Sequence, residues 1–202
     1  MCGLFIGIHD GKISLIHQTA REFLLRTKES PSYPDKWERC LDIATAHGTI
    51  SRICLAYLNF DDFAGTSRNH SSQNSYAQRE GERYHLLNYA AVNWVAHYSS
   101  QPSEFAKNAQ KAAQNLCNTS LPQQSYWFKI YCESEYLIFE DWTSLGIASL
   151  FGLRYVVETF LTETVDINAQ GGHYGNALQA ASSRGHNQIV QMLLDKGADV
   201  NA

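Results

Sequence analysis

The sequence has little of what would place a protein in a membrane or on a nucleic acid. None of its hydrophobic runs approaches the roughly 18 residues of a membrane span. Basic residues number 16 against 20 acidic ones, and the formal net charge of −4 argues against a nucleic-acid-binding surface. The start, Met1-Cys2-Gly3-Leu4, lacks the charged segment and cleavage site of a signal peptide and has no glycine at position 2 for myristoylation. We therefore expect an intracellular, cytoplasmic protein.

Motifs for catalysis, cofactor binding and metal binding are also missing. There is no G-x-S-x-G or H-E-x-x-H, and the stretch around Lys12 lacks the first glycine and the hydroxyl of a phosphate-binding loop. His9 and His17 flank a turn, but no third metal ligand accompanies them. Five cysteines without a C-x-x-C indicate reduced thiols. We predict no enzyme, no cofactor and no metal, and keep a cryptic hydrolase in the helical middle as an alternative.

What the sequence does contain is material for a hydrophobic core. Its 202 residues are 44% hydrophobic and 12% aromatic, which suits one or two folded domains. Apolar residues at helical spacing predict helices over 37–60, 84–98 and 105–116, the first interrupted or kinked at Gly48. Residues 126–131 are ambiguous. A polar stretch at about 61–83 predicts a flexible insertion.

An internal repeat with a shift of 33 residues fills the end of the chain. Residues 143–169 and 176–202 share nine of 27 positions without a gap, where chance would give about two. In the second copy a short helix with small residues precedes Gly185, and an apolar stripe from Ile189 to Leu194 follows. Gly197 stands where a helix ends in a left-handed residue. Because a helix pair of this kind cannot bury both faces alone, such units stack.

This second copy resembles an ankyrin repeat. Asn176-Ala177-Leu178-Gln179-Ala180-Ala181 occupies the place of T-P-L-H-x-A, and residues 193–202 match the tail of the repeat closely. The first copy is more degenerate, with Leu153 where histidine is usual and Thr164 in place of glycine. The resemblance implies a protein-binding face built from hairpin tips and first helices. On this register Gln170, His173, Tyr174, Ser183 and Arg184 are the expected partner-binding residues, unless the two repeats only form a stack interior.

The N-terminus carries a second resemblance. Two β-rich runs, 4–9 and 12–17, flank Asp10-Gly11, a strong hairpin signal, and Thr19 to Glu22 form a capping box before Phe23. This hairpin and helix resemble the end of the winged-helix segment in fungal NACHT-type signalling NTPases, which precedes helical linkers and ankyrin arrays. Few basic residues surround the segment, which favours packing over DNA binding.

Together these features predict a mainly α protein in three parts. Residues 1–27 would be the end of a winged-helix segment, 28–142 a helical linker, and 143–202 two ankyrin repeats. The NACHT–ankyrin resemblance implies a fragment of a signalling or non-self-recognition receptor whose NTPase module lies upstream. The chain itself would be a non-catalytic interaction module that binds a protein partner. The alternative is a stand-alone ankyrin adaptor.

Overall fold

The computed structural model describes residues 6–9, 12–15, 42–60, 84–163 and 165–201. The chain divides into two units, residues 1–47 and 48–202. Within residues 1–47, strands β1 (Ile6–His9) and β2 (Lys12–Leu15) pair antiparallel. The turn at 10–11, the helix expected after Thr19 and the insertion at 61–83 lie outside the described residues. The winged-helix ending therefore stays a prediction.

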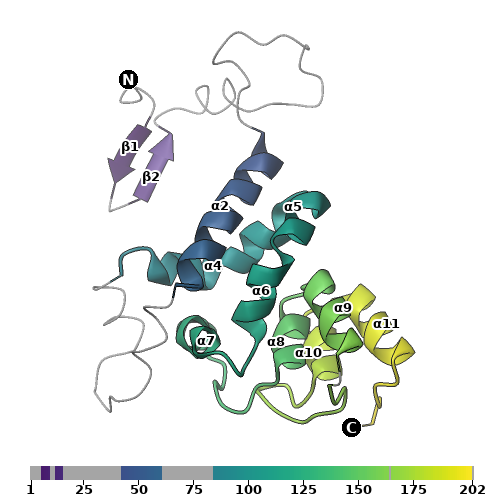
Figure 1. Ribbon diagram of the computed structural model, residues 1–202. Coiled ribbons are helices and arrows are strands. Elements are labelled where there is room, and N and C mark those ends of the chain that lie inside the picture. The colour runs from purple at the N-terminus through teal and green to yellow at the C-terminus, as the bar shows by residue number, and fades with distance from the viewer. Residues whose placement is uncertain (1–5, 10–11, 16–41, 61–83, 164, 202) are drawn as a thin grey trace, which may run out of the picture. The chain divides into compact units, whose positions relative to one another are not determined.

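The described part of the chain is mainly helical, with nine helices (Figure 1). Five of them precede the repeats: α2 (Ile43–Leu58), α4 (Leu87–Ser100), α5 (Ser103–Asn108), α6 (Gln110–Cys117) and α7 (Pro122–Glu135). The ambiguous residues 126–131 lie inside α7. Pro122 suits the first turn of this helix because that turn needs no amide donor from it.

Two details of the predicted helices are wrong. Helix α2 runs through Gly48 without a break, and a Cβ there would make only ordinary van der Waals contact with the Phe105 ring, at 3.5 Å. The helix expected over 105–116 is two helices, α5 and α6, which part at Ala109. The Ala109 amide donates to the Phe105 and Lys107 carbonyls, which closes α5, and its own carbonyl accepts from Ala113 in α6.

The core of residues 48–202 is aromatic. It joins helices α4 to α7, which we call the helical middle, to the repeats. Trp94 of α4 meets Trp127 of α7 edge to face, with ring centroids 5.2 Å apart. Phe151, at the end of the first repeat helix, lies 5.6 Å from Trp127 and 4.7 Å from Tyr131. Such contacts add to the large apolar area that each ring buries. The helical middle and the repeats therefore share one core.

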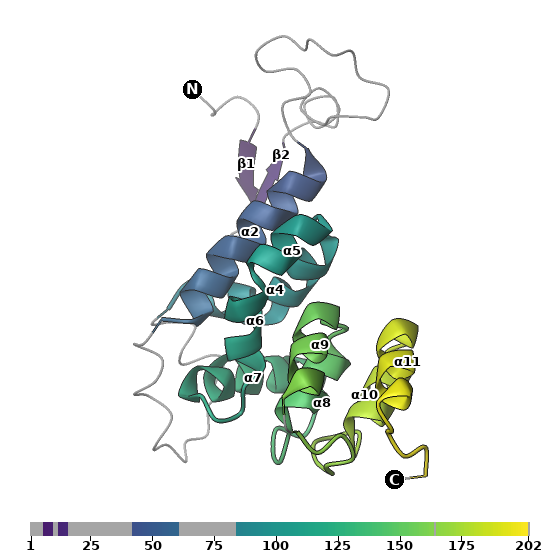
Figure 2. The same cartoon turned by 45° about the vertical axis from the view of Figure 1, so that its right-hand side comes forward.

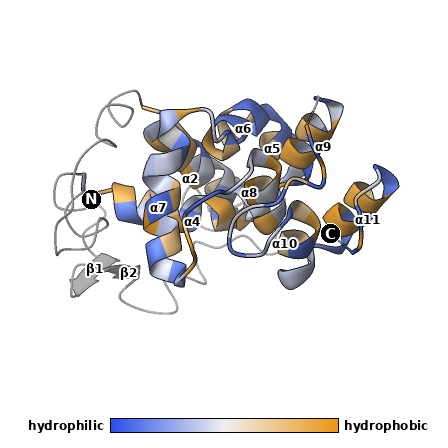
Figure 3. Ribbon diagram, turned by 90° about the horizontal axis from the view of Figure 1, so that it is seen from below, coloured by the Kyte–Doolittle hydropathy of each residue, from blue (hydrophilic) through white to orange (hydrophobic). Residues whose placement is uncertain are grey.

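The four C-terminal helices reproduce the 33-residue shift. They are α8 (Ser144–Leu150), α9 (Arg154–Thr162), α10 (Ala177–Ser183) and α11 (Asn187–Asp195). Helices α8 and α9 form one antiparallel pair, and α10 and α11 form a second (Figure 2). The pairs lie side by side, with α10 packed on α8 and α11 on α9. Figure 3 shows α11 with both hydrophobic and hydrophilic residues, as expected of a helix that covers a core on one side. We call residues 143–175 the first repeat unit and 176–202 the second.

Equivalent residues stand at the start and after the end of the first helix in each repeat unit. Thr143 accepts the amide of Gly146 at 2.9 Å, and Asn176, 33 residues on, accepts that of Gln179 at 2.8 Å. These caps satisfy amide groups that a helix start leaves without partners. Gly152 and Gly185 both have positive φ, 69° and 71°, which only glycine adopts readily. The predicted helical repeat is thus confirmed in three dimensions.

Candidate protein-interaction surface

The loop between α9 and α10 holds three of the five residues expected to bind a partner. Gln170 and His173 are exposed, and Tyr174 is half-buried. The Tyr174 ring packs edge to face on Trp142, with centroids 6.3 Å apart. The Nδ1 atom of His173 lies 3.5 Å from the amide of Ile138, from which it accepts. This loop is therefore positioned by the segment that precedes the first repeat unit.

The other two expected residues lie at the end of α10 and just after it. Ser183 is exposed, and its hydroxyl donates to the Ala180 carbonyl within the helix. Arg184 reaches back to Glu135 at the end of α7, with a nitrogen–oxygen distance of 4.0 Å. Since both side chains are partly exposed, this ion pair is screened and contributes little to stability. It still places a cation beside α7.

Sequence reasoning missed the segment that lies beside these residues. Tyr136 follows α7 with φ 56°, in the left-handed region, and its side chain is 93% exposed. Ile138, two residues on, is 59% exposed. No periodicity points to either residue, because neither belongs to a helix or a strand. Their only signal in the sequence is an apolar run between acidic residues.

Together, these features form what we call the loop surface: residues 136–141, the α9–α10 loop and the end of α10. Exposed Glu140 and Asp141 make its border acidic, and Arg184 supplies positive charge. Asp141 also has a left-handed backbone, with φ 59°. Burial raises the pKa of the nearby Tyr131 hydroxyl to about 12, so this side chain stays neutral at physiological pH.

The described cysteines are buried and built into the core. Burial raises the pKa of Cys54, Cys117 and Cys132, that of Cys132 to about 12. A thiol acts as a nucleophile or metal ligand only as the thiolate, so these groups are poorly suited to either role. In the part of the chain that the structure describes, no three His, Cys, Asp or Glu side chains gather as a metal site would require.

His186 has a structural place rather than a chemical one. Its Nε2 donates to the Leu150 carbonyl of the first unit at 3.1 Å. A Cβ on Gly152 would come within 2.7 Å of the imidazole ring, so the glycine leaves room for it. Among the described helices, none is long and apolar enough to cross a bilayer.

The geometry defines a protein with repeated helix pairs of the ankyrin type, and the comparisons with known proteins agree with it. Residues 175–202 match the ankyrin repeat family, so the chain carries an ankyrin repeat at its C-terminus. A protein of Monascus ruber named "Azaphilone pigments biosynthesis cluster protein L" is 57% identical to the chain over 204 residues. The match covers 92% of this chain and 41% of that protein, so the chain spans about two fifths of its relative's length.

Proposed function

We propose that this chain is a non-catalytic protein-interaction module and that its partner binds the loop surface. The ankyrin repeat supports the general role, since such repeats serve as protein-binding scaffolds. Tyr136 supports the choice of surface. Its left-handed backbone ends α7, where the amides of Tyr136 and Leu137 both donate to the Cys132 carbonyl. This ending leaves the Tyr136 side chain 93% exposed, as a large aromatic surface that a partner can bury.

The neighbours of Tyr136 favour a partner segment with both apolar and basic residues. Tyr136 and Ile138 offer apolar area that a partner can bury. Glu140 and Asp141 supply negative charge beside them, and charge complementarity raises the rate and specificity of association. Gln170, His173, Tyr174, Ser183 and Arg184 border the same area and would contribute polar contacts.

The Tyr136→Gly variant tests this surface without unfolding the protein. Glycine relieves the left-handed backbone, so the variant should be more stable than the wild type by about 1 kcal/mol. It should nevertheless capture at least tenfold less partner from a lysate of the encoding organism, as measured by quantitative mass spectrometry. Tyr89→Ala is the matched control, because Tyr89 is also an exposed tyrosine but lies on α4. Undiminished capture by Tyr136→Gly would contradict the proposal.

Two settings for the module follow from separate observations. The hairpin and helix motif of residues 4–26 supports a NACHT–ankyrin receptor with an NTPase module upstream. The name of the Monascus relative supports a protein that serves a pigment biosynthesis cluster. The identity of the captured partner separates them: an oligomerising NTPase favours the first, and a biosynthetic or regulatory protein of a cluster favours the second. A partner that belongs to neither group and binds the chain by itself favours a stand-alone adaptor.

A further inference from the structure

The short segment that follows α7 has side chains that alternate between solvent and the core. The exposed ones are Tyr136, Ile138 and Glu140, and the half-buried ones between them are Leu137 and Phe139. The Phe139 ring lies 6.1 Å from that of Phe128 in α7, between ring centroids. Alternation with a period of two is typical of an extended chain with one buried face. We call residues 136–140 the edge segment.

Side chains of the fold itself occupy one backbone edge of the edge segment. The Ile138 carbonyl accepts the indole N–H of Trp142 at 2.7 Å, and the Ile138 amide donates to His173 Nδ1 at 3.5 Å. In an extended chain the amide and the carbonyl of one residue point to the same edge, and those of its neighbours point to the opposite edge. The edge that Ile138 faces is therefore already taken.

The opposite edge holds backbone groups without partners. As far as the structure describes the chain, no hydrogen bond reaches the amide or the carbonyl of Phe139. The amide of Leu137 is used, because it donates to the Cys132 carbonyl at 2.9 Å where α7 ends. Unpaired backbone groups along an extended edge are a template for a further strand. This edge can therefore pair with another chain.

The charge around the edge segment is negative. Between Ile130 and Leu153 the sequence has four acidic residues and no lysine or arginine. The acidic residues are Glu133, Glu135, Glu140 and Asp141. Arg184 offsets one of these charges, that of Glu135, at 4.0 Å. A basic residue in an added strand would be attracted to this place, and opposite Glu140 it would form a favourable cross-strand pair.

We infer that the partner binds the edge segment as an extended strand, through hydrogen bonds to the backbone of Phe139. The inference rests on the proposed function and names the form of partner that the loop surface takes. Residues opposite one another in a sheet share a face, so the added strand would place apolar side chains beside Tyr136 and Ile138 and a basic one beside Glu140. Backbone pairing supplies affinity, and the alternate side chains supply specificity.

A synthetic peptide with N-methylated variants tests this mode of binding. The probe is the capped nonapeptide Thr-Lys-Thr-Ile-Thr-Ile-Thr-Lys-Thr, and its affinity for the full chain is measured by fluorescence anisotropy. One variant is methylated at the amides of the three inner threonines, and the other at both isoleucines and one lysine. Because a strand pairs through one edge at a time, one variant should bind at least tenfold more weakly while the other stays within twofold of the probe.

Amide hydrogen exchange of the full chain, followed by nuclear magnetic resonance, locates the pairing. Exchange of the Phe139 amide should slow at least tenfold when the probe is bound, because this amide gains an acceptor. The Ile138 amide faces the other edge and is the matched control, which should change less than twofold. An unchanged Phe139 amide in the presence of saturating probe would overturn the strand pairing.

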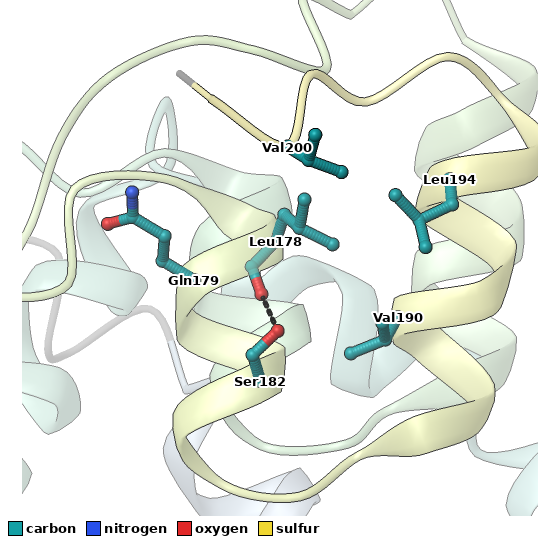
Figure 4. A pocket seen from close by; sticks show the side chains of 6 residues that line it. All are labelled: Leu178, Gln179, Ser182, Val190, Leu194 and Val200. Carbon is teal, nitrogen blue, oxygen red and sulfur yellow. Dashed lines mark hydrogen bonds between the residues drawn. The ribbon is translucent and has the colours of Figure 1, made fainter.

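A second apolar surface serves as the control for unspecific binding. Leu178, Val190, Leu194 and Val200 converge on a hollow at α10 and α11, while Gln179 points away (Figure 4). The resonances of these residues should not shift when the probe is added. Shifts confined to them would show that the peptide binds apolar area wherever it is open, and would overturn the inference.

The two N-methylated variants also separate this inference from the proposed function. Equal affinities of both variants, weakened or not, would overturn pairing through one backbone edge. The loop surface is judged apart from this, by partner capture with Tyr136→Gly. A loss of capture in that variant, together with failed pairing of the probe, would keep the loop surface as the binding site and reject the extended strand.

Discussion

At the scale of single residues, one position that differs between the two repeat units shows how a side chain suits its neighbours. Leu153 and His186 are equivalent, yet Leu153 is buried to 1% exposure while His186 reaches across to the preceding unit. Leu153 belongs to the core cluster, where an apolar side chain buries more favourably than an imidazole.

The buried thiols give a prediction at the same scale. Cys54, Cys117 and Cys132 should not react with iodoacetamide at pH 8 in the folded protein, because burial raises their pKa values and blocks access. All three should react in 6 M guanidinium chloride. Peptide mass spectrometry after each treatment measures this. Full labelling of Cys117 under native conditions would contradict the buried core.

At the scale of elements, polar bridges hold the helical middle to the repeats. Gln110 of α6 donates to the Tyr155 carbonyl at 2.9 Å and to the Thr159 hydroxyl. Gln114 donates to Glu163 at 2.9 Å. Helix α6 contacts both α8 and α9, so it covers the first unit on the side away from the second. A repeat pair that would otherwise need more neighbours is thus supported by a helix outside the repeat pattern.

The caps of the repeat helices give a prediction for one element. Asn176→Ala removes the acceptor for the Gln179 amide at the start of α10 and should lower the free energy of unfolding by about 1 kcal/mol. Asn176→Asp keeps an acceptor and should recover most of that loss. Urea unfolding followed by circular dichroism measures both. Equal losses for the two variants would show that the cap does not stabilise α10.

At the scale of the whole molecule, one aromatic core within residues 48–202 links residues far apart in the chain. Phe151 lies within 6.3 Å, between ring centroids, of Trp94, Trp127 and Tyr131. A cluster that joins α4, α7 and α8 predicts that the helical middle and the repeats unfold together, in one cooperative transition.

Phe151→Ala tests this link. The variant should lose about 3–5 kcal/mol of unfolding free energy, because truncation of a buried ring leaves a cavity. Phe105→Ala, at a phenylalanine that is 44% exposed, should lose about 1 kcal/mol or less. Tryptophan fluorescence and far-ultraviolet circular dichroism should report the same midpoint in urea. Separate midpoints would show two independently folding parts.

The sequence by itself determined the features that depend on neighbours along the chain. The 33-residue shift predicts the repeat helices, the small and apolar residues predict their inner faces, and glycine predicts the left-handed turns. Each of these is fixed by local backbone geometry and periodicity, which a linear pattern carries directly. For the same reason the ankyrin character of residues 175–202 could be recognised before the fold was known.

Only the tertiary structure decided which surfaces are covered and which are open. The helix break at Ala109 and the exposed, left-handed Tyr136 at the end of α7 are seen only in the structure, because no period in the sequence marks either place. The five expected binding residues have clear positions in the repeat register, but three of them, His173, Tyr174 and Arg184, contact residues 135–142, a segment outside that register. Burial depends on contacts between distant parts of the chain, and therefore the loop surface emerges only in three dimensions.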